Sequence, residues 1–420
     1  MTSIRKFHMH QRLSPALLLV SLLAGCDVPE PPPPTGGVDL APGACGAGLA
    51  VIGADNSYAS TNVSLLGLDG QVGSASVISS GATTTGLSTP LSGDVVVPTE
   101  RPASGEVVLI DRLAGVLTWL DPATGSVRAQ LSVATGFASN PHDYVEVDAH
   151  RAYVSRLGQA PVPGSEPFDG GSDVLVIDPS VPAIIDRIAF AAEGETPARP
   201  AQMLTVGDTV WVALERLDLD YKTGLDGLVV VLDRATGAVR GQASIPGLAN
   251  CNALGASPDR DRVAVACTGI INPDADVALQ LARSGVVVFD ATGDKPAEIT
   301  RITSATLGAA PPPDISPALT SSNRLLTTLL GDRDLGLPDR LVEVDLSVSG
   351  GVREIVRSEK PFKLGQIHCF LPCARVCYQA DAEAPGVRRL AVGDDGAVTA
   401  VDLIEVAPGL GLPPRNLGAF

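Results

Sequence analysis

One pattern constrains this chain more than any other: an apolar run that ends on an aspartate recurs at nearly constant spacing. The segment from Gly227 to Asp233, GLVVVLD, is one copy, and a short polar turn and a second alternating run follow it. The seven copies end at Asp69, Asp121, Asp178, Asp233, Asp290, Asp345 and Asp402, at intervals of 52 to 57 residues (for example, 121 − 69 = 52). Such regular spacing indicates a repeat architecture, in which each unit adds its own piece of core.

Each repeat has the composition of four short β-strands. In the fifth repeat the segments NALGAS, RVAVACT, GVVVFD and AEITRI follow one another, separated by turns and one long loop. Val, Ile and Thr within the runs and Gly, Pro and Asp between them are typical of strands and turns. The sequence therefore predicts an all-β fold, a seven-bladed β-propeller of four-stranded antiparallel blades. Each aspartate is expected to end a third strand and to open the turn to the fourth, which is a structural role.

The repeats also resemble a known family. The segments GVLTWLDPATGSVRAQLSVATG (115–136) and VVVLDRATGAVRGQASIPG (229–247) are similar to YVTN-type repeats, and AYVSRL (152–157) is the nearest copy of the motif that names them. This resemblance implies a seven-bladed propeller of the bacterial cell envelope. The Trp-Asp signature of WD40 blades is missing.

The N-terminal residues have the character of a lipoprotein signal. Residues 1–25 combine a basic start, a short apolar stretch and small residues, and Leu23 to Cys26 resembles a bacterial lipobox. This pattern predicts acylation of Cys26, a Pro-rich tether over residues 26–45 and a propeller over residues 46–420. The protein is then extracytoplasmic and lipid-anchored, at the outer membrane or the periplasmic face of the inner membrane. The alternative is an ordinary signal peptide with an incidental cysteine.

The charge balance excludes one class of partner. The chain has 47 acidic and 30 basic residues, a net charge of −17. Such a surface repels nucleic acid and anionic lipid. It favours simple solubility or, alternatively, affinity for cations or a basic partner.

Six cysteines besides Cys26 predict disulfides in an oxidising compartment. Cys251 and Cys267 flank a turn symmetrically and are expected to pair across a hairpin. Cys45 is expected to pair with Cys369, Cys373 or Cys377, which locks the ring, while the other two pair locally. The alternatives are two buried free thiols in the first case and, in the second, a metal site made with His368.

The ends of the propeller must also be joined by strands. The first repeat begins with GLAVIGAD, which already has the character of a second strand. Its innermost strand, or an outer strand of the last blade, must therefore come from the other terminus, and both solutions are open.

Long acidic loops are expected to share one face of the propeller, because second-to-third-strand loops all project to the same side. They span residues 158–173, 216–227, 269–285 and 331–340. Loops on a rigid scaffold are common binding sites. Asp218, Asp220 and Asp226 make a weak calcium-loop pattern, so a bound divalent cation is one expectation and a solvated rim is the other.

Two histidines are placed alike relative to the strand-ending aspartates: His142 precedes Asp178 by 36 residues, and His368 precedes Asp402 by 34. Both are therefore expected near the central channel on the loop-rich face, His142 with Asn140 and Asp143. Such a pair binds a cation or acts in acid–base chemistry. The alternative is two hydrogen-bonded histidines without a ligand.

These features lead to a prediction of function. The main prediction is a non-enzymatic binding or scaffold module for a protein or envelope partner, with no catalytic or cofactor-binding residue assigned. The alternative is a propeller enzyme of the lactonase or lyase kind, with a metal or the histidines at the channel, and a third possibility is a calcium-stabilised adhesin. Convergent polar side chains in the channel favour the enzyme, and apolar walls favour the scaffold.

Overall fold

The structure is a computed structural model that describes residues 45–420 except 56, 271–276, 294, 309, 313–315, 334, 349–350 and 372. These residues belong to one compact unit that extends from Gly37 to Phe420. The predicted signal peptide, the acylated Cys26 and nearly all of the tether lie outside the described residues. No helix in the described part of the chain has the length and apolar character needed to cross a membrane.

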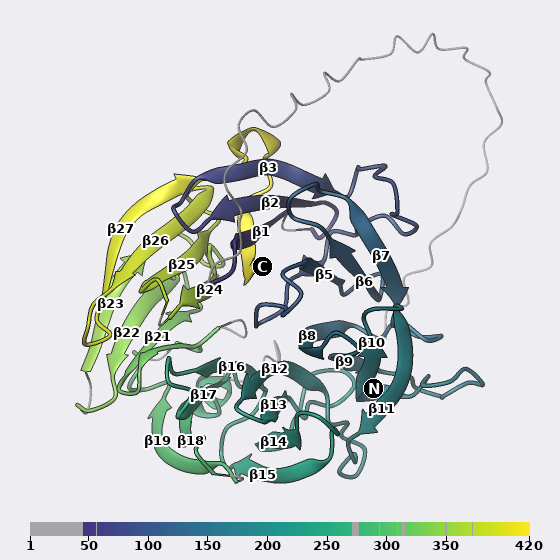
Figure 1. Ribbon diagram of the computed structural model, residues 1–420. Helices are drawn as coiled ribbons and strands as arrows, with labels where there is room; N and C mark the ends of the chain where they lie inside the picture. Colours follow the sequence, from purple (N-terminus) through teal and green to yellow (C-terminus); the bar gives the residue numbers. More distant parts are fainter. Residues whose placement is uncertain are drawn as a thin grey trace, which may run out of the picture. The chain divides into compact units, whose positions relative to one another are not determined.

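The described strands form seven antiparallel sheets of four strands each, arranged as blades around a ring (Figure 1). The predicted fold is therefore confirmed. Numbered in chain order and given from the innermost strand outward, blade I is β28 (Pro414–Ala419), β1 (Gly48–Ala54), β2 (Thr61–Gly67) and β3 (Val72–Ser79). Blade II is β4 (Val95–Val96), β5 (Val107–Asp111), β6 (Val116–Leu120) and β7 (Val127–Ser132). Blade III is β8 (Pro141–Asp148), β9 (Arg151–Gln159), β10 (Gly171–Asp178) and β11 (Ala183–Ala189).

The other blades repeat this order. Blade IV is β12 (Pro200–Val206), β13 (Thr209–Leu214), β14 (Gly227–Asp233) and β15 (Val239–Ile245). Blade V is β16 (Cys251–Ala256), β17 (Arg262–Cys267), β18 (Gly285–Asp290) and β19 (Ala297–Thr303). Blade VI is β20 (Ala318–Ser321), β21 (Arg324–Leu329), β22 (Arg340–Asp345) and β23 (Gly351–Arg357), and blade VII is β24 (Leu364–Phe370), β25 (Val376–Asp381), β26 (Gly386–Val392) and β27 (Val398–Glu405). Two short helices, α1 (Val277–Ala282) and η1 (Pro408–Leu410), lie between strands.

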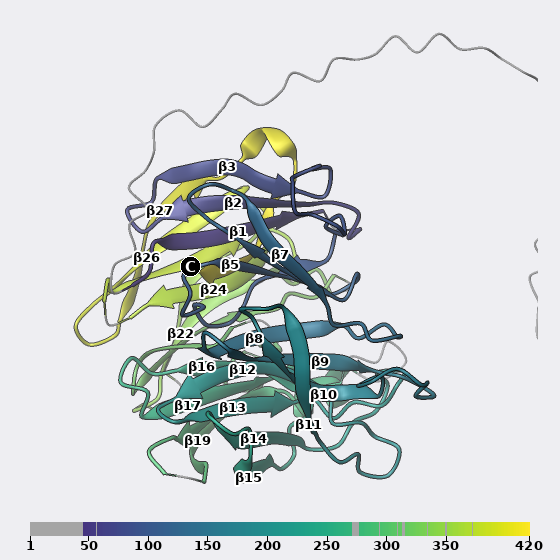
Figure 2. The ribbon, with the colours of Figure 1, turned by 45° about the vertical axis from the view of Figure 1, so that its right-hand side comes forward.

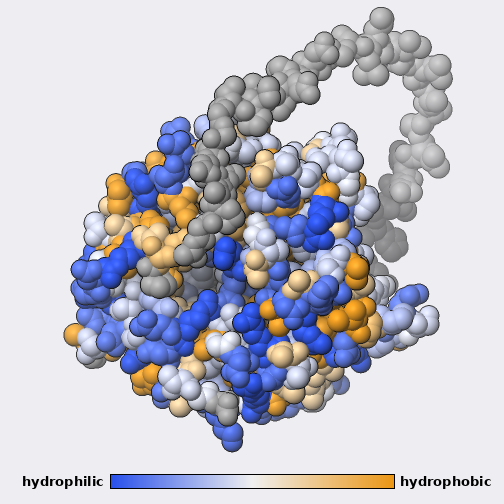
Figure 3. All heavy atoms as spheres, viewed as in Figure 1, coloured by the Kyte–Doolittle hydropathy of each residue, from blue (hydrophilic) through white to orange (hydrophobic). Residues whose placement is uncertain are grey.

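The core lies between the blades. Each of the seven hydrophobic clusters combines side chains of two adjacent blades, for example Trp211 of β13 with Phe289 of β18. Middle strands such as β13 are therefore covered on both faces and buried along their length, which explains their continuous apolar runs. Outer strands such as β11 are largely exposed. On the face shown in Figure 3, apolar patches are accordingly small and scattered among polar side chains.

The recurring aspartates open the turns to the outer strands, as predicted, in six of the seven blades. In each, a carboxylate oxygen accepts a hydrogen bond from the main-chain N–H two residues further on, as from Asp69 to Gln71 at 2.9 Å. The seventh assignment is wrong, because Asp402 lies inside the outer strand β27. The equivalent residue is Asp395, which accepts from the N–H of Ala397 at 3.0 Å in the turn between β26 and β27.

The C-terminal strand closes the ring. β28 pairs with β1, with Leu49 opposite Ala419 and Val51 opposite Leu417. The innermost strand of blade I therefore comes from the C-terminal end of the chain. This pairing decides between the two solutions that the sequence left open.

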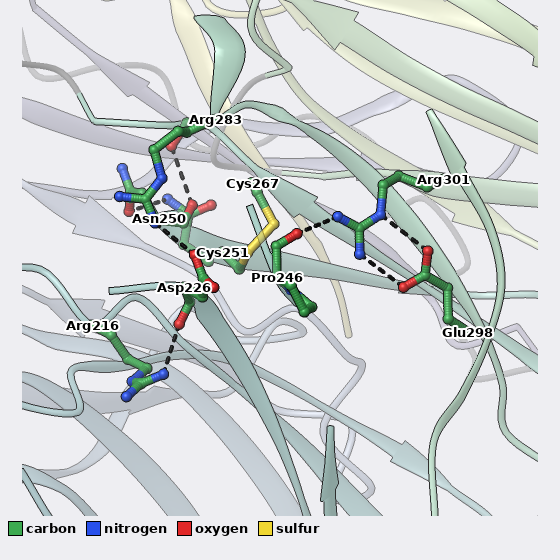
Figure 4. Close-up of a disulfide and its surroundings, with 11 residues drawn as sticks. Arg216, Asp226, Pro246, Asn250, Cys251, Cys267, Arg283, Glu298 and Arg301 are labelled. Atoms are coloured by element: carbon green, nitrogen blue, oxygen red, sulfur yellow. Dashed lines mark hydrogen bonds and ion pairs between the residues drawn. A yellow bond between two sulfur atoms is a disulfide. The ribbon is translucent and has the colours of Figure 1, made fainter. Parts of the chain in front are cut away.

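Three disulfides are present, and their pairing agrees with the predictions. Cys251 and Cys267 are direct partners in the register of β16 and β17, and Figure 4 shows their bond. Cys45 is bonded to Cys373 across a sequence separation of 328, and Cys369 is bonded to Cys377 within the β24–β25 hairpin. The alternative metal site of His368 with three thiolates is therefore wrong, because these sulfurs are bonded to one another or to Cys45.

We expect the Cys45–Cys373 bond to contribute more stability than the local Cys369–Cys377 bond. In the chain-entropy model, closing loops of these lengths (separations of 328 and 8) is worth about 6 and about 2.5 kcal/mol. The C45A/C373A variant should therefore have a lower urea midpoint than the C369A/C377A variant. Equal midpoints for the two variants would show that strand β28 alone holds the ring.

Candidate functional site

The two ends of the central channel are built from different segments. The chain enters each innermost strand on the same side as the second-to-third-strand loops, which include the long segments after β9, β13, β17 and β21. We call this side the loop-rich face, and we call the side that carries the short hairpin turns the turn face. A cavity lies at each end of the channel.

The cavity on the loop-rich face has a volume of about 460 Å³. We call it the arginine pocket, because Arg112, Arg333 and Arg415 line it. Two acidic residues, Asp55 and Asp94, are its only acidic lining residues in the described part of the chain. The pocket therefore has an excess of positive charge in a chain whose net charge is −17.

These arginines come from three blades that only the closed ring brings together. Arg112 lies in the β5–β6 turn of blade II, and Arg333 lies in the β21–β22 loop of blade VI. Arg415 is near the start of β28, the strand that the C-terminal segment contributes to blade I. Closure of the ring is therefore a condition for the pocket.

Each arginine of the pocket has a neighbour that positions it. Arg112 forms an ion pair with Asp94 at 2.5 Å. Arg415 donates a hydrogen bond from Nη1 to the main-chain oxygen of Phe362 at 2.7 Å, and burial lowers the pKa of its guanidinium below the usual value. The Arg333 guanidinium lies 5.8 Å from the centre of the Phe362 ring, within the range of a cation–π contact.

Two aromatic residues at the pocket are held in an unusual backbone conformation. Tyr58 has φ of 56° and Phe362 has φ of 58°, in the left-handed region that bulky residues rarely adopt. The two residues are 59% and 45% exposed, and both line the pocket. Strained backbone and exposed aromatic rings together are typical of a binding site rather than of a packed core.

His142 is at the same end of the channel. It is the second residue of β8, and its Nδ1 is buried without a hydrogen-bond partner in the described part of the chain. Burial, with a smaller contribution from the charge of Arg112, lowers the pKa of His142 to about 3. The ring is therefore neutral at physiological pH and has an unused nitrogen.

Asp143 and Asn140 accept hydrogen bonds from main-chain N–H groups and thereby stabilise the channel wall. The Asp143 carboxylate accepts hydrogen bonds from the N–H groups of Thr99 at 2.9 Å and Met203 at 2.7 Å, which joins blades II, III and IV at the channel wall. Burial raises the pKa of Asp143 to about 7, although these hydrogen bonds favour the charged form. Asn140 has φ of 45°, and its main-chain oxygen accepts from the N–H of Leu157.

His368 does not join His142. It lies near the end of β24, beside the turn face, where it lines the second cavity, of about 290 Å³. The spacing argument predicts the wrong side for His368 because it measures the distance in sequence from Asp402, which does not follow a third strand. Counted from the true equivalent, Asp395, His368 is only 27 residues upstream (395 − 368 = 27), nine fewer than the 36 between His142 and Asp178.

The acidic loop residues form hydrogen bonds or ion pairs with other residues of the protein. Asp218 accepts from the N–H groups of Lys222 and Thr223 at 2.8 and 2.9 Å. Asp226 forms an ion pair with Arg283 at 2.8 Å, visible in Figure 4, and Asp220 lies 3.8 Å from the Lys222 ammonium. Among the described residues, no group of three or more His, Cys, Asp or Glu side chains is arranged to hold a metal ion. The expected cation site stays a prediction.

Sequence reasoning missed the arginine pocket. Arg112, Arg333, Arg415, Asp94, Tyr58 and Phe362 share no motif and are scattered over the chain. No local pattern in the sequence indicates which arginines meet, because the three come from different repeats.

Comparison with known proteins relates the fold to solved structures. No family model and no curated protein matches the sequence. A periplasmic gluconolactonase from Pseudomonas aeruginosa has 16% identity and a TM-score of 0.56, with 88% of this chain and 98% of that chain covered. A putative 6-phosphogluconolactonase from Bacteroides fragilis has 12% identity and a TM-score of 0.53, with coverage of 88% and 96%. A protein from Lactobacillus plantarum has 9% identity and a TM-score of 0.54, with coverage of 88% and 98%.

These similarities define a class. The protein is a seven-bladed β-propeller whose structural neighbours include propellers of the gluconolactonase kind. The prediction of a non-enzymatic binding or scaffold module is wrong in this respect, because the neighbours named as lactonases favour the alternative, a propeller enzyme. Charged side chains converge at both ends of the channel, which agrees with this correction.

The histidines predict a pH dependence of stability. The pKa values of His142 and His368 are lowered to about 3 and about 4, so between pH 6.5 and 4 the unfolded chain binds more protons than the folded one. Their contribution to stability is therefore lost as the pH falls. Asp143, with its raised pKa, acts in the opposite direction between pH 7 and 4.

As the pH falls from 7 to 4.5, we expect the thermal midpoint of the H142Q/H368Q variant to rise relative to that of the unchanged protein, because the variant lacks the two imidazoles that bind protons more readily in the unfolded chain. The matched control is H150Q, because the His150 side chain is 76% exposed. Parallel curves for the double variant and the control would contradict the assignment of buried neutral imidazoles.

Proposed function

We propose that this protein is a propeller enzyme of the lactonase kind, whose reaction takes place in the arginine pocket. The observation that carries the proposal is the convergence of Arg112, Arg333 and Arg415 at one end of the channel, beside two exposed aromatic rings. The structural similarity to a gluconolactonase from Pseudomonas aeruginosa supports the choice of reaction.

The chemistry of lactone opening fits these side chains. Water adds to the carbonyl carbon, the ring C–O bond breaks, and the proton that water loses goes to the released alkoxide, so the product is a hydroxycarboxylic acid. Negative charge develops on the carbonyl oxygen as water adds. Guanidinium groups fixed in advance stabilise this charge, which is often the largest single contribution to catalysis.

The residues have distinct roles in this proposal. Arg112, held by Asp94, and Arg415, held by the main chain at Phe362, face the developing oxyanion. Tyr58 and Phe362 offer ring faces for the apolar side of a cyclic substrate. Carboxylate oxygens of Asp55 and Asp94 are hydrogen-bond acceptors that orient the attacking water.

Replacing Arg112 or Arg415 by glutamine should lower kcat/KM for lactone hydrolysis by about 10²-fold, the order found when one oxyanion donor is removed. Glucono-δ-lactone and a panel of δ- and γ-lactones are assayed by release of acid, corrected for spontaneous opening. The control is R357Q, because Arg357 pairs with Glu354 on outer strand β23, away from the channel.

Two results would reject the proposal. One is a protein that opens none of these lactones faster than buffer does. The other is a pair of Arg112 and Arg415 variants that are as active as R357Q.

We also propose that the enzyme is anchored outside the cytosol by acyl chains on Cys26, which the lipobox-like sequence supports. Mass spectrometry of the protein purified from a bacterial envelope should find an N-terminal cysteine that carries fatty acids. C26S should release the protein from the membrane fraction, and an unmodified N-terminus in the membrane-bound protein would contradict the anchor.

A further inference from the structure

The cavity at the other end of the channel is a second site with its own chemistry. This turn-face pocket, of about 290 Å³, is lined by polar residues that do not belong to the arginine pocket. They include Glu100, Arg101, Arg260, Gln366 and His368, with Thr99, Ser257 and Ser316 as smaller polar residues. Apolar side chains of the innermost strands, such as Leu204 and Leu254, complete the lining.

One ion pair across the pocket is fully satisfied. Glu100, which follows β4 in blade II, binds Arg260 of blade V at 2.5 Å. The second carboxylate oxygen of Glu100 accepts from the N–H of Thr205 at 2.7 Å and from its hydroxyl at 2.8 Å. The charges of Glu100 and Arg260 therefore compensate each other and leave little for a ligand.

Arg101 is the uncompensated charge of the turn-face pocket. It lines the cavity, is exposed, and forms no ion pair or hydrogen bond within the described part of the chain. Gly46, with φ of 88°, allows the aliphatic part of Arg101 to lie close to the main chain, because a Cβ there would be 2.7 Å from the Arg101 Cδ. The guanidinium is thus positioned by its stem while its five donors are free.

His368 and Gln366 add neutral hydrogen-bonding groups. No hydrogen bond to the His368 ring is made by any described residue, and burial lowers its pKa to about 4, so the ring is neutral and offers one donor and one acceptor. The Gln366 Oε1 accepts from the N–H of Leu417, which turns its amide nitrogen to other partners.

The ligand that matches this set has a carboxylate and hydroxyl groups. A free guanidinium binds a carboxylate through paired hydrogen bonds, and a neutral imidazole and an amide bind hydroxyls. A positive centre at the channel mouth also favours anion binding there over the acidic remainder of the surface of a chain with net charge −17.

We propose that the turn-face pocket binds a small hydroxycarboxylate through Arg101, with His368 and Gln366 as partners of the hydroxyl groups. The site is at the opposite end of the channel from the arginine pocket. It therefore stands independently of the proposed lactonase activity.

Three six-carbon probes separate the contributions of the two chemical groups. Gluconate has the carboxylate and the hydroxyls, hexanoate has only the carboxylate, and sorbitol has only the hydroxyls. In calorimetric titrations of the R112Q variant, in which the arginine pocket has lost one of its three arginines, gluconate should bind at least tenfold more tightly than either other probe.

Variants of the pocket locate the ligand. In the R112Q background, R101Q and H368Q should each weaken gluconate binding at least tenfold, and R101K should weaken it less because it keeps the charge. The control is R375Q, an exposed arginine on the same face that pairs with Asp394. Its affinity should stay within twofold of the parent, and thermal midpoints check that all variants are folded.

Three outcomes overturn the inference. Gluconate binding no tighter than sorbitol would remove the role of the charge. An unchanged affinity in R101Q would remove Arg101 as the anchor. Binding that is present in the unchanged protein but lost in R112Q alone would place gluconate in the arginine pocket. If the unchanged protein hydrolyses no lactone while the R112Q variant still binds gluconate, the proposed function is rejected and this inference stands.

Discussion

Packing between neighbouring blades is the interaction on which the rest of the structure depends. A single four-stranded blade leaves both faces of its middle strands uncovered, and each of the seven hydrophobic clusters is completed only by the next blade. The ring must therefore close, and the joint between blades VII and I carries the most reinforcement. Strand β28 pairs with β1 there, Leu417 and Ala419 enter the shared cluster with Tyr378, and the Cys45–Cys373 bond spans the same joint. Figure 2 shows blade VII, with β26 and β27, beside blade I, with β1 to β3, although the two blades come from opposite ends of the chain.

Ring closure also creates the chemistry of the channel. The innermost strands of neighbouring blades offer few hydrogen-bond partners to one another's main-chain groups. Side-chain oxygens bridge them instead: Asp143 accepts from the N–H of Met203, Gln202 from that of Leu254, and Gln366 from that of Leu417. These bridges fix the spacing of the wall. Where the wall ends, arginines from different blades gather, and an acidic molecule acquires two positively charged openings with different neighbours. One has exposed aromatic rings and the other has a neutral imidazole, which is why we assign them different ligands.

The fold could be predicted because its signals are local. Strand runs and turn aspartates lie within a few residues of one another, and the hydrogen bond from Asp233 to the N–H two residues on is a property of that short segment alone. The same reasoning failed where two segments look alike. Its pattern makes the outer strand around Asp402 look like a third strand, and that shift of position predicts the wrong face for His368. Periodicity finds strands, but it does not say which position in the blade a strand occupies when turn lengths vary.

The sequence by itself determined the number of blades, their four-stranded form and the pairing of Cys251 with Cys267, because each follows from contacts between neighbouring segments. Only the tertiary structure decided which terminus supplies the innermost strand of blade I, which cysteine Cys45 meets, and which arginines share a pocket. Arg112 and Arg415 are about three hundred residues apart in the chain and become neighbours only when the ring closes. Contacts of that kind depend on the geometry of the whole molecule, and no local pattern of residues encodes them.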